Sequence, residues 1–250
     1  MKKLVCMLLK TKMDRAYEVV PSAAALAKSD SDIPDKLPQL PMRLCVFGAS
    51  ASGKGVLIAS LLGKDFPYKK IFKKNVWIYS PTISLGDPSF ADVDLSPDHY
   101  VSDYDEMHIN KIWREQDKII SAHGKKIAPQ ILLIFDDVVT SLTNAKSSLL
   151  RKLYFSGRHS LISTICCSQL YSALPRAVRM NASDAIFFEA GRKARMLVGE
   201  EQSIDPEQFE AIMEQATSDA PYSFLYVRYK KPVASRYMLR FTGRFFEVAR

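Results

Sequence analysis

The amino-acid sequence predicts an α/β fold in which a mostly parallel sheet is covered by helices on both faces. Short apolar runs alternate with helical patterns from residue 42 to residue 217, the order typical of βαβ units. The apolar runs do not alternate with polar residues, so we expect strands that are buried on both sides. A glycine-rich turn, GASASG at 48–53, separates the first apolar run from the first helical pattern.

Five apolar runs are predicted as strands because each ends at turn-forming or polar residues. The predicted strands cover residues 42–47, 75–81, 130–137, 161–169 and 184–190. Near the end of the chain, YSFLYVRY (222–229) and SRYMLRFTG (235–243) alternate in polarity with a turn between them. These two runs predict a C-terminal β-hairpin extension.

Helical patterns fill most of the intervals between the strands, at 53–63, 103–124, 144–159, 175–181 and 205–217. The clearest pattern is 103–124, which has acids in its first turns, apolar residues at helical spacing and Gly124 at its end. Residues 82–103 contain glycine and proline punctuation, so most of this segment is predicted as a loop.

The first 41 residues differ from the rest of the chain. SDSDIPDKLPQLP (29–41) is rich in serine, aspartate and proline and predicts an extended connector, preceded by a short helix over 15–27. We therefore expect an N-terminal extension and linker over 1–41 and one main domain over 42–250. Residues 205–250 would form the C-terminal extension of that domain.

The composition limits the class of protein. The 250 residues are 47% hydrophobic and 25% charged, and the net charge of +8 is compatible with an acidic partner such as nucleic acid. The four cysteines show no CxxC spacing, which argues against a zinc site or a disulfide scaffold. The apolar stretch Leu4–Leu9 is too short for a secretory or membrane-spanning segment. We expect a soluble intracellular protein with no membrane span.

Residues 48–54, between a predicted strand and a predicted helix, fit the phosphate-binding pattern GxxxxGK. Backbone N–H groups of such a loop wrap phosphates, the helix N-terminus adds a favourable dipole, and Lys54 would reach the β- and γ-phosphates. The expected nucleotide-binding residues are Gly48, Ala49, Ser50, Ala51, Ser52, Gly53, Lys54, Gly55 and Val56.

Gly55 departs from the pattern, because a serine or threonine hydroxyl that ligates Mg²⁺ is expected there. Ser50 or Ser52 would supply an oxygen instead, or water would fill the coordination position, which Mg²⁺ tolerates. The third alternative is a nucleotide-binding protein with little or no hydrolysis.

Polar residues at the ends of later strands complete the candidate site. Asp136 and Asp137 follow the third strand and are expected to act as Walker B acids, the first holding Mg²⁺ through water and the second polarising the attacking water. Gln169, after the fourth strand, is a candidate sensor of the γ-phosphate. Arg158 is the first candidate for an arginine that acts on a neighbouring subunit's nucleotide, and the others are Arg176, Arg179, Arg192 and Arg195.

The order of these parts is that of an additional-strand P-loop ATPase core, because a strand ending in a polar sensor follows the Walker B helix. Four strings carry a more specific resemblance: LPMRLCVFGASASGKG, VWIYSPT, ILLIFDDVV and SGRHSLISTICCSQLYSALPRAVRMNASDAIFF. Over Leu40–Phe188 the chain resembles the poxvirus-type genome-packaging ATPases of the FtsK–HerA superfamily.

The resemblance implies an ATP- and Mg²⁺-dependent translocase that pumps double-stranded DNA into a preformed viral capsid. It also implies a homo-oligomeric ring of five or six subunits, partners at the capsid or portal vertex, and residence in the host cytoplasm, a viral factory or the virion. Motif by motif, it assigns Lys54 to the phosphates, Asp136 and Asp137 to Walker B and Gln169 to the sensor. Two alternatives remain: another DNA pump of the superfamily, or a nucleotide-binding, weakly hydrolysing DNA-binding or scaffold module.

Overall fold

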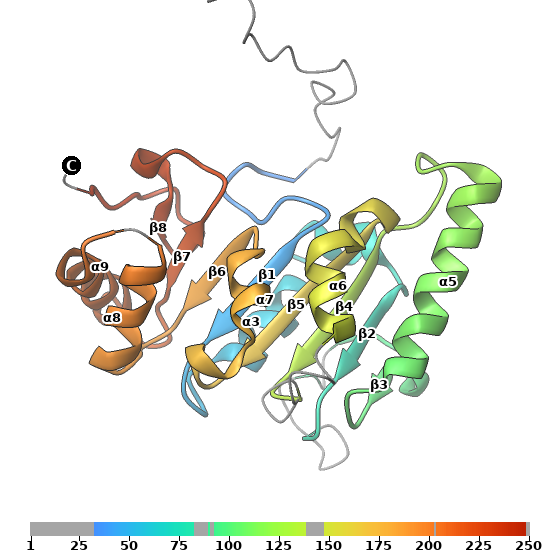
Figure 1. Ribbon diagram of the computed structural model, residues 1–250, viewed down its shortest axis with the longest axis horizontal. Helices are drawn as coiled ribbons and strands as arrows, with labels where there is room; N and C mark the ends of the chain where they lie inside the picture. The colour runs from blue at the N-terminus through green and yellow to red at the C-terminus, as the bar shows by residue number, and fades with distance from the viewer. Residues whose placement is uncertain (1–32, 83–89, 91–92, 139–147, 203, 249–250) are drawn as a thin grey trace, which may run out of the picture. The chain divides into compact units, whose positions relative to one another are not determined.

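The computed structural model describes residues 33–82, 90, 93–138, 148–202 and 204–248. The predicted helix over 15–27 lies outside these residues. The described part contains an eight-stranded sheet of order β3-β2-β4-β5-β1-β6-β7-β8 (Figure 1). The strands are β1 Arg43–Phe47, β2 Val76–Tyr79, β3 Tyr100–Val101, β4 Ile131–Asp136, β5 Ile162–Ser168, β6 Asp184–Phe187, β7 Leu225–Arg228 and β8 Tyr237–Leu239.

Strands β1 to β6 are all parallel, so their carboxyl ends meet at one edge of the sheet. Strand β5 lies between β1 and β4, with Phe47 paired to Ser168 on one side and Asp136 paired to Cys167 on the other. The insertion of β5 between these two strands confirms the predicted additional-strand core.

Helices cover both faces of the sheet, as predicted. Their bounds are α3 Lys54–Leu61, α4 Tyr68–Phe72, α5 Glu106–His123, α6 Ser148–Ser156, α7 Arg176–Met180, α8 Arg192–Glu201 and α9 Pro206–Ser218. Helices α3 and α4 lie behind the sheet in Figure 1, and α5, α6 and α7 lie in front of it. Each face has its own apolar core, and alternate strand residues point into the two cores: Leu44 and Val46 into one, Cys45 and Phe47 into the other.

The C-terminal hairpin is confirmed and extends the sheet. Strand β7 is antiparallel to β6 and β8 is antiparallel to β7, joined by residues 229–236. Because β7 runs against β6, the segment 219–224 that precedes β7 returns to the edge where the parallel strands end.

Three elements differ from the sequence prediction. The two-residue edge strand β3 lies inside the predicted loop 82–103, and the helices α4 and α8 were not predicted. Helix α4 has only five residues, and α8 buries only Val198 and Gly199. Neither helix therefore carries enough apolar periodicity to be recognised in the sequence.

Residues 33–41, inside the predicted linker, pack against the domain. Ile33 and Leu37 are buried in the same core as α3 and α4, and the Tyr68 hydroxyl donates a 2.7 Å hydrogen bond to the carbonyl oxygen of Pro38. Over the described part of the chain, helices of a length and hydrophobicity suited to crossing a bilayer are absent.

Candidate functional site

The glycine-rich loop joins the end of β1 to the start of α3 at the carboxyl edge of the sheet. Ala51 (φ 60°) and Gly53 (φ 101°) adopt left-handed backbone conformations that turn the chain sharply into the helix. A Cβ built on Gly48 would lie 2.5 Å from Ser52 Oγ and 2.8 Å from Phe188 Cβ, so the loop closes tightly over this glycine. The first N–H groups of a helix lack intrahelical acceptors, and the loop brings those of α3 to the end of β1.

Lys54 folds back across this loop. Its ammonium donates hydrogen bonds to the carbonyl oxygens of Gly48 (2.9 Å) and Ala49 (3.0 Å), and the residue is only 7% exposed. The charge of Lys54 therefore lies within the loop, among the backbone groups that would surround a phosphate.

The two serines considered as substitutes for a hydroxyl at position 55 lie differently. Ser50 is exposed, whereas Ser52 Oγ is buried against Gly48 and has no hydrogen-bond partner among the described residues. Ser52 Oγ thus lies inside the loop.

The two predicted acids lie at the same edge. Asp136 ends β4, and Asp137 follows with a left-handed φ of 54° while its N–H donates to the carbonyl oxygen of Cys167 at 3.3 Å. Aspartate tolerates this conformation better than most residues. Burial, followed by the nearby Asp136, raises the pKa of the Cys167 thiol well above its usual value, which keeps this thiol neutral beneath the acids.

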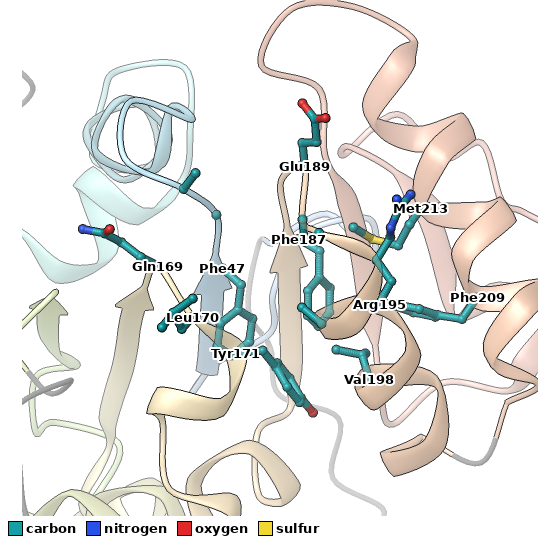
Figure 2. A pocket seen from close by; sticks show the side chains of 15 residues that line it. Phe47, Gln169, Leu170, Tyr171, Phe187, Glu189, Arg195, Val198, Phe209 and Met213 are labelled. Atoms are coloured by element: carbon teal, nitrogen blue, oxygen red, sulfur yellow. The ribbon is translucent and has the colours of Figure 1, made fainter.

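Gln169 and Asp137 are brought together as their positions on neighbouring strands predict. Gln169 Nε2 donates to Asp137 Oδ2 at 3.2 Å. In Figure 2 the Gln169 side chain points away from the rings of Phe47 and Phe187, and the bond to Asp137 places its amide at the end of β4.

Ser80 and Thr82 are site residues that the sequence reasoning missed. Ser80 Oγ donates to Asp136 Oδ2 at 3.2 Å and lies 2.9 Å from Thr82 Oγ1. The available signal was positional, because Ser80 directly follows β2 and β2 is the strand beside β4.

Tyr222 was also missed, since its run was considered only as a hairpin. Its side chain is 72% exposed, its φ of 58° is left-handed, and its Cδ1 lies 3.3 Å from a Cβ built on Gly53. A large exposed ring thus stands against the last glycine of the loop.

The predicted arginine, Arg158, lies in a 3₁₀ turn that leads into β5, at the amino ends of the strands. Arg158 therefore lies at the edge of the sheet opposite the loop of its own chain. Any role at a nucleotide would require a neighbouring subunit and stays a prediction. The other four candidates form ion pairs within the chain, Arg176 and Arg179 with Glu201 and Arg192 and Arg195 with Glu210. In the described residues Arg158 contacts His159 (3.5 Å) and has no carboxylate partner.

A cavity of about 200 Å³ lies beside the loop on the face covered by α8 and α9 (Figure 2). Its wall includes Gly48 and Ala49 together with the rings of Phe47 and Phe187, which stack with centroids 5.2 Å apart. Ligand pockets measure roughly 300–1,000 Å³, so this cavity is too small to be the nucleotide pocket.

Comparisons with known proteins identify the family to which this sequence is similar. The sequence profile described as "Poxvirus A32 protein" matches residues 33–209. The DNA packaging protein OPG160 of Variola virus and that of Vaccinia virus (strain Copenhagen) are each 30% identical to the chain over 154 residues, 59% of this chain and 53% of theirs. The chain thus spans about half the length of the curated relatives it matches.

Solved structures share the fold. B204, the DNA-packaging ATPase of Sulfolobus turreted icosahedral virus, superposes with a TM-score of 0.56 at 16% identity, over 83% of this chain and 98% of that chain. The conjugation coupling protein TcpA of pCW3, in a structure with ATPγS, gives a TM-score of 0.50 at 11% identity over 80% of this chain and 60% of that chain.

The profile match covers well over half of the chain and includes the loop, both acids, Gln169 and Arg158. The resemblance inferred from the sequence is therefore confirmed at the level of the family. This chain belongs to the poxvirus A32 protein family.

Proposed function

We propose that this chain hydrolyses ATP and uses the energy to move double-stranded DNA into a preformed viral capsid. The main support is the position of β5 between β1 and β4. This order brings the Lys54 loop, Asp136, Asp137 and Gln169 to the carboxyl edge of the sheet. The relatives named above are DNA packaging proteins, which supports the choice of DNA and capsid as partners.

Nucleotide binding would begin with an exchange at Lys54. The ammonium leaves the two carbonyl oxygens of Gly48 and Ala49 and contacts the β- and γ-phosphates, while the loop N–H groups surround the phosphate chain. The exposed ring of Tyr222, fixed against Gly53, would support the nucleotide base beyond the loop.

Hydrolysis would use Asp137 to orient and deprotonate the attacking water. The water oxygen forms a bond to the γ-phosphorus, its proton passes to the Asp137 carboxylate, and the bond to the leaving ADP oxygen breaks. Gln169, already hydrogen-bonded to Asp137 Oδ2, would hold the carboxylate in position and contact the γ-phosphate. Arg158 of a neighbouring subunit would neutralise the charge that develops on the phosphoryl oxygens.

The residues near Asp136 fit Mg²⁺ despite the missing hydroxyl on Gly55. Asp136 contributes a carboxylate, and Ser80 and Thr82 place two hydroxyl oxygens beside it. Such oxygen donors suit Mg²⁺, which also retains several waters. When bound, Mg²⁺ would neutralise charge on the β- and γ-phosphates; Asp136 and Ser80 would fix the waters around it.

Gly55 supports a second candidate function, a nucleotide-dependent DNA-binding or scaffold module with weak hydrolysis. Without a hydroxyl at this position, metal affinity and turnover would depend on Asp136, Ser80, Thr82 and water. The translocase proposal includes a ring of five or six subunits, because Arg158 needs a neighbouring subunit in order to act. It also includes contacts with the capsid vertex.

Steady-state ATP hydrolysis with Mg²⁺, with and without duplex DNA, tests the two candidates. We expect DNA-stimulated turnover that Lys54→Ala and Asp137→Asn abolish and that Gly55→Ser preserves or increases. If the wild type binds nucleotide without turnover and only Gly55→Ser hydrolyses ATP, the translocase proposal is refuted and the second candidate is supported.

A further inference from the structure

Charge is divided between the two edges of the sheet. In the described connections at the amino ends of the strands (33–42, 62–75, 93–99, 124–130, 157–161, 181–183 and 229–236), there are twelve lysines and arginines and four carboxylates, Asp35, Asp65, Asp94 and Asp98. At the carboxyl edge, the described residues 48–53, 80–82, 102–105, 137–138, 169–175, 188–191 and 219–224 contain five carboxylates and no lysine or arginine, and the segment 240–245 after β8 contains Arg240 and Arg244. Most of the positive charge of these connections thus lies at the edge opposite the nucleotide-binding loop. We name this edge, with its twelve basic residues, the amino edge.

The densest part of the amino edge surrounds α4. Tyr68 and Phe72, one helical turn apart, are fully buried and fix the orientation of the helix. That orientation leaves Lys69 and Lys70 in solvent, and Lys73 and Lys74 follow directly and are also exposed. Lys69, Lys73 and Lys74 line a shallow groove whose one carboxylate is Asp94.

Almost all of these cations lack a carboxylate partner within the described residues. Lys231 is the exception, since its Nζ lies 2.6 Å from Asp35. The arginines near α8 behave differently, as each pairs with a glutamate in its own chain.

Like charges at the amino edge also approach one another. Burial and then the charges of Arg43 and Arg158 lower the pKa of Lys230, and burial and then the charge of Arg158 lower the pKa of Arg43. The buried Asp184 offsets only part of this effect, since the pKa of both groups stays lowered. Positive groups held close together repel one another, and a bound polyanion relieves that repulsion.

We propose that the amino edge is the surface that holds duplex DNA, through its phosphate backbone and without reading sequence. This inference rests on the proposed function for the identity of the polyanion. Lysine binds phosphate as a flexible point charge, and lysine contacts to phosphates position a duplex without reading its sequence. A packaging enzyme that accepts any sequence requires this kind of contact.

The placement has a mechanical consequence. DNA and nucleotide bind opposite edges and do not compete for one surface. Helix α3 begins at Lys54 in the loop and leads, through residues 62–67, directly to the lysines of α4. A shift of α3 upon nucleotide binding would therefore move the amino edge.

The test uses fluorescence anisotropy of a labelled duplex with the full chain, titrated at several salt concentrations. One variant combines Lys69→Gln, Lys70→Gln, Lys73→Gln and Lys74→Gln. The matched control removes the same charge from exposed positions away from the amino edge, with Lys111→Gln, Arg114→Gln, Lys193→Gln and Arg244→Gln. Melting curves and binding of a fluorescent ATP analogue verify that both variants are folded.

Each phosphate contact contributes about 0.9 to the slope of log K against log salt concentration. We expect the α4 variant to lose about 2–4 from that slope and to bind DNA at least tenfold more weakly, while the control keeps the wild-type slope. Equal slopes and affinities for the two variants would overturn the inference. It would also be overturned if the α4 lysines were needed to bind vesicles of anionic lipid but not duplex DNA.

The two proposals fail separately. DNA binding that depends on the α4 lysines, in a chain without ATP turnover, supports the amino edge and refutes the translocase. Turnover that DNA stimulates equally in the wild type and the α4 variant supports the translocase and refutes the amino edge.

Discussion

The proposed support of the nucleotide base by Tyr222 can be isolated from phosphate binding. Tyr222→Ala removes the ring but leaves a non-glycine residue at the same left-handed φ of 58°, so the backbone strain is unchanged. Stacking of a base on an aromatic ring contributes about 1–3 kcal/mol by alanine substitution. Since the Tyr222 residue is 72% exposed, we expect the lower part of that range, about 1–2 kcal/mol.

A loss of this size corresponds to a roughly 5- to 30-fold weaker affinity for ATP. Isothermal titration with ATP and, separately, with inorganic tripolyphosphate measures it, because tripolyphosphate has no base to stack. We expect Tyr222→Ala to weaken only ATP binding and Tyr222→Phe to bind ATP like the wild type. Met107→Ala, which removes another highly exposed apolar side chain, is the control. Equal losses for ATP and tripolyphosphate, or no loss for either, would refute the base-stacking role.

Three other changes probe the site and the packing around it. Ser80→Ala removes the hydrogen bond to Asp136, an effect of about 1 kcal/mol. We expect hydrolysis to require a higher Mg²⁺ concentration and turnover to fall about fivefold; an unchanged Mg²⁺ titration would contradict this. Gly53→Ala forces a Cβ onto a φ of 101° beside Tyr222, a strain of about 1–2 kcal/mol, so calorimetry should show a lower Tm and titration should show weaker nucleotide binding. The hydrogen bond from Lys231 is the main cause that lowers the pKa of Asp35 in the folded protein. The ionised Asp35 therefore stabilises the fold at pH values above the pKa that it has in the unfolded chain. This stabilisation is lost as the pH falls through the pKa that Asp35 has in the folded protein. Asp35→Asn should therefore lower the Tm near neutral pH and have no effect in strong acid, and an equal effect at both would show that charge is not the cause.

The parts of the fold that sequence reasoning predicted share one physical property. Strands β1, β4 and β5 are buried on both faces, so continuous apolar runs identified them without knowledge of their neighbours. The strand order itself was predicted only through the position of Gln169 after β5, a single polar residue at the end of a buried run.

The missed residues depend on contacts that are distant in sequence. Ser80 acts through β2, which pairs with β4 across more than 50 residues, and Tyr222 reaches Gly53 only because β7 reverses the chain direction. Neither contact leaves a local pattern. Helix α8 was missed for a different reason: Arg192 and Arg195 pair with Glu210 of α9, and the helix buries only Val198 and Gly199.

Lys54 is bound by the backbone of its own loop. Its ammonium already has two carbonyl oxygens as partners, and hydrogen bonds to a charged group are each worth about 1.5–3 kcal/mol. A ligand must therefore offer enough negative charge to compete with the loop for its own lysine. The affinity of the loop for a ligand would then depend first on the phosphate charge within reach of Lys54 and only afterwards on the base. After hydrolysis, the return of the Lys54 ammonium to the carbonyl oxygens of Gly48 and Ala49 would assist product release.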